Sequence, residues 1–333
     1  MFHARSRVVG GKNWRSNASP LPVASTLDAI GNTPVVQLQR LTPPDSAAVY
    51  VKVESVNPTG SYKDRMALAM IEEAEERGAL TKGLTVIEYT GGGTGSSLAF
   101  VCAAKGYRFH AVSSDAFAAS KLNTMRAFGA ELTIVHSPSG NISGELIQEM
   151  ISVAATIAAQ GGYYQTDQFN NRDSLVGYAG IGRELLGQFP EGIDAFCGAV
   201  GTAGMLMGVS GVLKDHAQDT RIVALEPASA PAITEGRSGQ HHVEGIGVGF
   251  VPPLLDTDLY DEARAIDEAI ARTTCRQLAR QEGLLVGTSA GLNIAAALDL
   301  ARELGSGKIV VTVAPDTGLK YLDEHLFVQP ATA

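Results

Sequence analysis

The sequence predicts an α/β protein with two domains, each built on a parallel-rich, open, twisted sheet covered by helices. Its 333 residues exceed one ordinary domain and suit two α/β domains. Short apolar runs alternate with stretches of helical periodicity along the whole chain. The apolar runs are continuous rather than alternating, which is typical of strands that helices bury on both faces.

The predicted elements follow one another in a regular rhythm. In the first half, strands are expected at 49–53, 84–89, 109–113 and 131–135, with helices at 66–76, 96–105, 120–128 and 147–159. In the second half, we expect helices at 175–186, 202–213, 267–282 and 290–304, with strands at 195–200, 221–225 and 308–313. Several of these helices end at a glycine, which is a common stop signal.

These elements predict where the domains begin and end. Residues 41–170 should form a smaller N-terminal domain, and residues 25–40 together with 171–327 should form a larger C-terminal domain. Residues 1–24 are predicted to be a loose extension, and no regulatory domain is expected after the second domain. Residues 241–262 carry glycines and prolines with little periodicity, so we expect a long ordered loop with a functional role.

Composition excludes several classes of protein. The net charge of −9 gives no general reason to bind nucleic acid or an anionic membrane. No apolar stretch reaches the roughly 20 residues that a membrane span needs. The three cysteines, Cys102, Cys197 and Cys275, are widely separated, as expected for reduced thiols in a cytoplasmic protein. The histidines do not cluster at ligand spacing, so no metal site is expected.

Two glycine-rich segments lie between a predicted strand and a predicted helix, where open parallel sheets bind ligands. The segment Gly201-Thr202-Ala203-Gly204-Met205 offers backbone N–H groups and a helix N-terminus to a phosphate, although a simple tight turn explains it equally well. The segment Thr90-Gly91-Gly92-Gly93-Thr94 offers similar donors and two hydroxyls to a carboxylate.

A third candidate is Lys63, which lies where the turn 57–62 becomes a helix. A cation is disfavoured near a helix N-terminus, so the pKa of this lysine should fall, as a covalent-catalysis lysine requires. A solvated surface lysine is the more common explanation for any single lysine.

Taken together, these segments resemble the fold-type II pyridoxal-5′-phosphate (PLP) enzymes, whose fold is like that of tryptophan synthase β. The chain is most similar to the cysteine synthase (O-acetylserine sulfhydrylase) and cystathionine β-synthase family. The matching motifs occur in the family's order across residues 27–322 and are Ile30–Pro34, Asn57–Arg65, Thr90–Gly95, Gly201–Gly204, Glu244–Phe250, Gly287–Gly291 and Pro315–Gly318.

The resemblance implies a role for each segment. Lys63 would be the Schiff-base lysine and general base, residues 201–205 would hold the cofactor phosphate, and Ser289 would face the pyridine nitrogen. The substrate would be held by Thr90, Gly91, Gly92, Thr94, Gln168 and Gly247, with Gly93 next to the cofactor ring. The implied partners are a small amino-acid substrate, a small nucleophile and a second copy of the chain in a cytoplasmic homodimer.

The substrate loop departs from the family pattern Thr-Ser-Gly-Asn-Thr, because Gly91 and Gly93 replace the serine and the asparagine. We therefore hypothesise an emptier loop that accepts a different β-substituent or a nucleophile other than sulfide. The implied activity is β-replacement on O-acetyl-L-serine with sulfide. Alternatives are O-phosphoserine as the donor, a non-sulfide nucleophile, a serine or threonine dehydratase, a non-catalytic regulator and, remotely, a dinucleotide-binding oxidoreductase.

Overall fold

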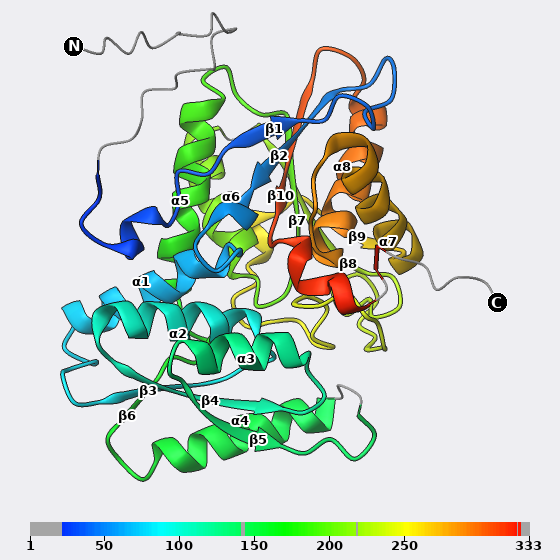
Figure 1. Cartoon of the computed structure of the whole chain (residues 1–333). Coiled ribbons are helices and arrows are strands. Elements are labelled where there is room, and N and C mark those ends of the chain that lie inside the picture. Colours follow the sequence, from blue (N-terminus) through cyan, green and yellow to red (C-terminus); the bar gives the residue numbers. More distant parts are fainter. Residues whose placement is uncertain (1–21, 141–143, 218, 325, 328–333) are drawn as a thin grey trace, which may run out of the picture.

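The computed structural model describes residues 22–140, 144–217, 219–324 and 326–327. The predicted N-terminal extension, residues 1–24, lies almost wholly outside these residues. The described chain forms two units that lie one above the other, and each is a sheet with helices on both faces (Figure 1).

The larger sheet has six strands in the order β1 (Val35–Gln37), β2 (Ala48–Val53), β10 (Ile309–Ala314), β7 (Ala195–Ala199), β8 (Arg221–Pro227) and β9 (Glu262–Ile266). All neighbours are parallel except β1, which pairs antiparallel with β2. Helices α5 (Asp173–Gln188) and α6 (Gly204–His216) cover one face, and α7 (Glu268–Gln277) and α8 (Thr288–Leu304) cover the other.

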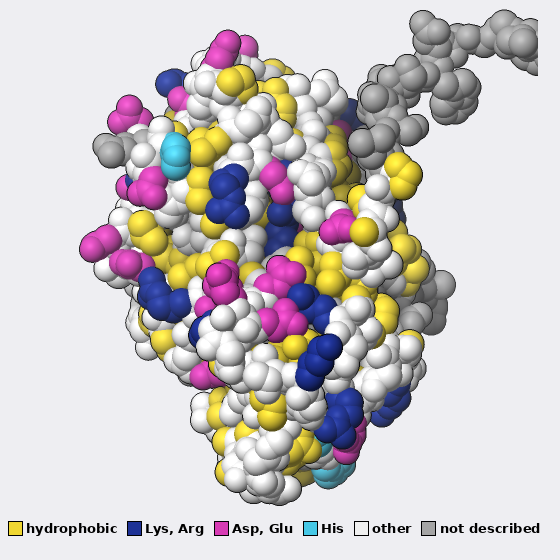
Figure 2. Space-filling model, turned by 90° about the vertical axis from the view of Figure 1, so that its left-hand side faces the viewer, with side chains coloured by type: hydrophobic (Ala, Val, Ile, Leu, Met, Phe, Trp, Pro, Cys, Tyr) yellow, Lys and Arg dark blue, Asp and Glu magenta, His cyan; other side chains and the backbone are white. Residues whose placement is uncertain are grey.

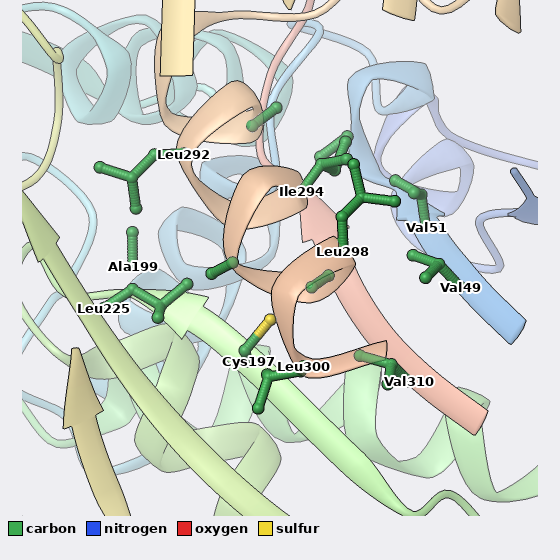
Figure 3. Packing of buried hydrophobic residues seen from close by; sticks show 14 of the residues in the cluster. Val49, Val51, Cys197, Ala199, Leu225, Leu292, Ile294, Leu298, Leu300 and Val310 are labelled. Atoms are coloured by element: carbon green, nitrogen blue, oxygen red, sulfur yellow. The ribbon is translucent and has the colours of Figure 1, made fainter. Parts of the chain in front are cut away.

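The core of this sheet follows the two-residue period of its strands. Cys197 points toward α8, whereas its neighbour Phe196 points toward α5 and α6. Figure 3 shows Leu292, Ile294 and Leu298 of α8 packed over the strands. Because both faces are buried, the strands lack a polar face, which is why their sequences are continuously apolar.

The smaller sheet has four parallel strands in the order β5 (Glu131–Val135), β4 (Arg108–Ser114), β3 (Thr85–Tyr89) and β6 (Tyr163–Gln165). Helices α1 (Lys63–Glu76), α2 (Gly93–Lys105) and α3 (Ala119–Ala127) cover one face. Helix α4 (Gly144–Ala158) covers the opposite face. The predicted alternation of strands and helices is confirmed, and the fold class is α/β.

One expected assignment is wrong. Residues 48–53, which we placed in the smaller domain, form β2 and pair with β10 in the larger sheet. Helix α1 is shared, since Met66 and Met70 pack against the helices of the larger sheet while Ala67 and Ile71 pack with α2. A strand's partners depend on distant sequence, so the local pattern could not show this. The division into two domains otherwise stays a prediction.

Other differences lie at element ends. Helices α1, α2 and α8 each begin two or three residues before the predicted start, which brings Lys63, Gly93 and Thr288 into first turns. The short strand β6 was not predicted, and β9 begins at the last residue of the loop predicted over 241–262. None of the described helices is long and apolar enough to cross a membrane. On the face shown in Figure 2, acidic and basic side chains are interspersed with apolar ones.

Candidate active site

Three candidate segments each follow the carboxyl end of a strand. The segment 90–94 follows β3, the segment 201–205 follows β7, and the segment 315–318 follows β10. The turn before α1 is tied to the last of these, since the N–H of Tyr62 donates to the carbonyl of Pro315 over 2.8 Å. The tertiary structure therefore holds the turn that carries Lys63 at the end of β10.

Lys63 is the first residue of α1, and its side chain is half-buried. Its Nζ lies 4.9 Å from the centre of the Tyr62 ring, and its Cδ and Cε lie 3.3 Å from where a Cβ on Gly93 would be. Burial lowers the pKa of Lys63 to about 8, assisted by the positive charges of Lys320 and Lys121 and opposed by Asp316. A substantial fraction of this amine is thus neutral near physiological pH, which a nucleophile and general base requires.

The loop 90–94 presents unused backbone donors. The Thr90 hydroxyl oxygen accepts hydrogen bonds from the N–H groups of Gly92 (3.1 Å) and Gly95 (3.0 Å). Within the described part of the chain, the N–H groups of Gly91, Gly93 and Thr94 have no acceptor. These donors lie at the positive end of α2, so they form a suitable cradle for a carboxylate.

Gln168 contacts this loop from the side. Its amide oxygen accepts from the Thr94 hydroxyl over 2.7 Å, and its amide nitrogen donates to the carbonyl of Tyr89 over 3.0 Å. The Thr94 hydroxyl hydrogen is therefore already used, and its oxygen can only accept. A carboxylate in this loop would depend on backbone donors more than on the Thr94 side chain.

The space beside Gly91 is not empty. A Cβ on Gly91 would lie 2.6 Å from Cε1 of Phe117, and a Cβ on Gly92 would lie 2.6 Å from Cδ of Lys121. The hypothesis of an emptier loop is thus wrong at Gly91, because an aromatic ring takes the place of the missing serine side chain. Neither Phe117 nor Lys121 was predicted from the sequence, since their positions depend on how α3 packs against α2.

This arrangement predicts a compensating pair of substitutions. Gly91→Ser alone should overlap the Phe117 ring and raise KM for the amino-acid substrate by about 10-fold or more. Adding Phe117→Ala should reverse most of that effect by opening the space. The measurement is steady-state kinetics of both single variants and the double variant.

A matched control is Gly187→Ser, since a Cβ on Gly187 meets nothing within 4 Å. If Gly91→Ser raised KM equally with and without Phe117, the ring would not be what fills this space.

The segment 201–205 has the geometry of an anion cup. Ala203 adopts a left-handed conformation (φ +69°) just before α6, and the N–H of Gly204 lies 3.5 Å from the Thr202 hydroxyl. A Cβ on Gly201 would lie 2.2 Å from the Gly245 carbonyl oxygen, so the loop 244–250 packs directly against the cup. The Met205 side chain turns away toward Gly198 and the core, which leaves only its backbone for a ligand.

Both ends of the loop 244–250 also contact residues that belong to the smaller sheet and its surrounding segments. Glu244 forms an ion pair with Lys121, and the Phe250 ring lies 5.4 Å from the Phe169 ring. Between them, Gly247 donates its N–H to Val200 over 3.0 Å, and its carbonyl accepts from His241 over 2.8 Å. Gly247, a predicted substrate residue, thus has both backbone groups paired within the protein.

Two buried oxygens are available near the site. The Thr288 hydroxyl in the first turn of α8 has no hydrogen-bond partner among described residues, and neither has Oδ1 of Asp316. Ser289, the predicted partner of a pyridine nitrogen, is buried in the same turn. The cup, the carboxylate cradle, the activated lysine and these oxygens fit a phosphorylated aldehyde cofactor that carries an amino acid. No group of three or more metal-ligating side chains occurs among the described residues.

Comparisons with known proteins agree with this geometry. The family model described as "Pyridoxal-phosphate dependent enzyme" matches residues 26–316. This chain belongs to that family. Its cofactor is PLP.

Individual similar proteins indicate which members of this family the chain resembles. A cysteine synthase of Staphylococcus aureus is 42% identical over 309 residues, covering 92% of this chain and 97% of the relative. Crystal structures of an O-ureido-L-serine synthase (TM-score 0.87, 37% identity, 93% of this chain and 98% of that one) and of a cysteine synthase from Entamoeba histolytica (TM-score 0.89, 29% identity, 96% and 95%) share the fold. The protein is therefore a fold-type II PLP enzyme, as the motifs predicted.

The lowered pKa of Lys63 predicts how this PLP enzyme takes up its cofactor. Only the neutral amine can form a covalent bond to the cofactor aldehyde. The rate of cofactor uptake by cofactor-free protein should therefore rise from about pH 6, be half-maximal near pH 8 and level off above about pH 9. Stopped-flow absorbance at constant ionic strength measures this rate. A rate that kept rising in proportion to hydroxide up to about pH 10 would show an ordinary lysine instead.

Proposed function

We propose that this enzyme catalyses β-replacement on an activated L-serine, with O-acetyl-L-serine as the donor and sulfide as the nucleophile. The observation that carries the proposal is the position of Lys63, an amine with a lowered pKa, beside Gly93 in a loop with three unused N–H donors. The similarity to cysteine synthases over more than nine tenths of the chain supports the choice of reaction.

We assign the binding groups as follows. The backbone N–H groups of Gly91, Gly93 and Thr94 would hold the substrate carboxylate, with the Thr90 hydroxyl and Gln168 shaping the loop around them. Residues 201–205 would hold the cofactor phosphate at the N-terminus of α6. Ser289 would face the pyridine nitrogen, where a hydroxyl leaves that nitrogen largely unprotonated.

Lys63 would then move the proton. When bound, PLP supplies the electron sink that lets the α-proton and the β-group leave. The Nζ of Lys63 would take the proton from the α-carbon of the substrate. Acetate departs with its bonding electrons, the nucleophile adds at the β-carbon, and Lys63 returns the proton to the α-carbon.

O-phospho-L-serine is a second candidate donor. The ammonium groups of Lys320 and Lys121 lie close enough to Lys63 to lower its pKa, while the negative charge of Asp316 opposes them and Lys121 is paired with Glu244. A doubly charged phosphate group is attracted to ammonium groups more strongly than a neutral acetyl group is. One similar protein of known structure is an O-ureido-L-serine synthase, which is why the test below also varies the nucleophile.

The test is a donor and nucleophile matrix. Purified, PLP-loaded enzyme would receive O-acetyl-L-serine or O-phospho-L-serine together with sulfide, hydroxyurea or no nucleophile, and products would be quantified by mass spectrometry. Cysteine from O-acetyl-L-serine and sulfide as the fastest product supports the proposal. Faster turnover of the phosphate ester supports the second candidate, and pyruvate as the main product with every nucleophile would point to a dehydratase.

We further infer that the enzyme is a cytoplasmic homodimer. Cys102, Cys197 and Cys275 are all buried and unpaired, which is consistent with a reducing compartment. The homodimer is the assembly that the family resemblance implies. Light scattering gives the molar mass in solution, and twice the chain mass of 34.8 kDa is expected.

A further inference from the structure

Glu88 is a buried carboxyl group to which the proposed reaction gives no part. It lies in β3, two residues before Thr90, and its side chain is completely inaccessible to solvent. Its Oε2 accepts from the Thr166 hydroxyl over 2.6 Å and from the N–H of Gln168 over 3.0 Å. Its Oε1 is buried and has no hydrogen-bond partner among the described residues. A buried carboxyl with one unpaired oxygen is costly, which calls for an explanation.

The two bonds of Glu88 hold a strained turn. Thr166 and Gln168 flank Asp167, a non-glycine residue in the left-handed region (φ +50°). This conformation costs about 1 kcal/mol or more for such a residue and persists where neighbouring groups fix it. Glu88 therefore holds the N–H of Gln168, while the bonds of Thr166 to the Ile87 carbonyl hold the start of the turn.

Gln168 in turn contacts the carboxylate loop and the strand before it. Its side chain accepts from the Thr94 hydroxyl and donates to the carbonyl of Tyr89, so it joins the start of α2 to the end of β3. The three residues form a chain of hydrogen bonds from Glu88 through Gln168 to Thr94. The N–H of Thr94 is one of the unused donors assigned to the substrate carboxylate.

We propose that Glu88 is a positioning residue for the substrate carboxylate, acting through Gln168 and Thr94. The inference rests on the proposed function, since it assumes that the loop 90–94 binds an amino-acid carboxylate. Burial raises the pKa of Glu88 to about 8, and the negative charge of Asp167 adds to this, although the hydrogen bonds oppose it. The group is thus mainly neutral near pH 7 and does not repel a bound carboxylate.

The test compares Glu88→Gln with Glu88→Ala. Glutamine keeps an acceptor for Thr166 and Gln168 and resembles the neutral acid, so KM for the amino-acid donor should stay within about threefold of the parent value. Alanine leaves the N–H of Gln168 without an acceptor and leaves the Thr166 hydroxyl only the carbonyl of Ile87, 3.3 Å away, so KM should rise by about 10-fold to 100-fold, while kcat changes much less. KM for the nucleophile is expected to stay unchanged in both variants.

A purely structural role gives a different pattern. If Glu88→Ala only destabilised the fold, the folded fraction and therefore kcat would fall while KM stayed the same, and that result would overturn the inference. A second readout that needs no turnover is the affinity of the PLP-loaded protein for L-serine, which has no activated leaving group. Isothermal titration calorimetry measures this affinity. Equal L-serine affinity in the alanine and glutamine variants would also overturn it. Absence of turnover in the parent enzyme with every donor would instead contradict the proposed function.

Discussion

Replacing Arg65 by methionine should lower the free energy of unfolding by about 3–5 kcal/mol. The Arg65 guanidinium forms two hydrogen bonds to each of two carboxylates, to Glu54 over 2.7 and 2.9 Å and to Glu184 over 2.7 and 2.9 Å. Glu54 is completely buried, so removing Arg65 leaves a desolvated negative charge. The ammonium of Lys52 pairs with Glu184 over 2.6 Å, and it would compensate only part of the negative charge that Arg65 now balances.

The same network predicts a dependence on acid. Although partial burial alone would raise the pKa of Glu184, its bonds to Arg65 and Lys52 lower it from 4.5 to about 2. A carboxyl whose pKa is depressed by folding stabilises the protein above its unfolded pKa and loses that contribution as pH falls toward its folded pKa. The stability lost between about pH 4.5 and pH 2 should therefore be smaller in Arg65→Met than in the parent protein.

Urea unfolding followed by circular dichroism measures the stability change. The control is Arg77→Met. Because Arg77 is 45% exposed in its ion pair with Asp173, this substitution should lower the free energy of unfolding by less than about 1 kcal/mol. If the cost at Arg65 comes from the unpaired charge, adding Glu54→Gln to Arg65→Met should recover part of it. Equal losses for Arg65→Met and Arg77→Met would contradict this account.

Replacing Lys63 by alanine should reduce turnover at least about 1,000-fold, because in the proposed reaction the same amine holds the cofactor and transfers the proton. The variant should still bind PLP noncovalently, since the cup at 201–205 does not include this side chain. Borohydride reduction and peptide mass spectrometry should find the cofactor attached to Lys63 in the parent protein and absent from that peptide in the variant.

Lys82→Ala is the matched control. Because Lys82 is exposed, this substitution should leave activity unchanged. Lys121 and Lys320 provide an internal check, since their charges reach Lys63. A cofactor adduct on either of them in the parent protein would show that the assignment of Lys63 is wrong.

For the fold, the local pattern predicted most elements but not which strands pair. The continuous apolar runs of β7, β8 and β10 correctly indicated a sheet buried on both faces. β2 was assigned to the wrong sheet because its apolar pattern would suit either one. Its register with β10 is created by contacts between residues about 260 positions apart in sequence.

For the site, the sequence identified the groups that need a particular residue type. The proposed catalytic amine has to be a lysine, here residue 63, and the proposed backbone cradles need small residues at 91–93 and 201–204, so these appear as motifs. Phe117, Lys121 and Glu88 act through position rather than through a motif, and they were missed. The glycine pair at 91 and 93 suggested an open loop because the sequence does not show which side chain fills a neighbouring space.

The sequence by itself thus determined the class of fold and the cofactor, and it supplied the proposed covalent lysine, because each depends on residue types at fixed local spacing. The tertiary structure alone decided how the site is lined: an aromatic ring against Gly91, a lysine along Gly92 and a buried acid behind Gln168. The physical reason is that chain connectivity constrains spacing along the sequence. Packing between α2, α3 and the two sheets decides which distant side chains occupy the space around each loop.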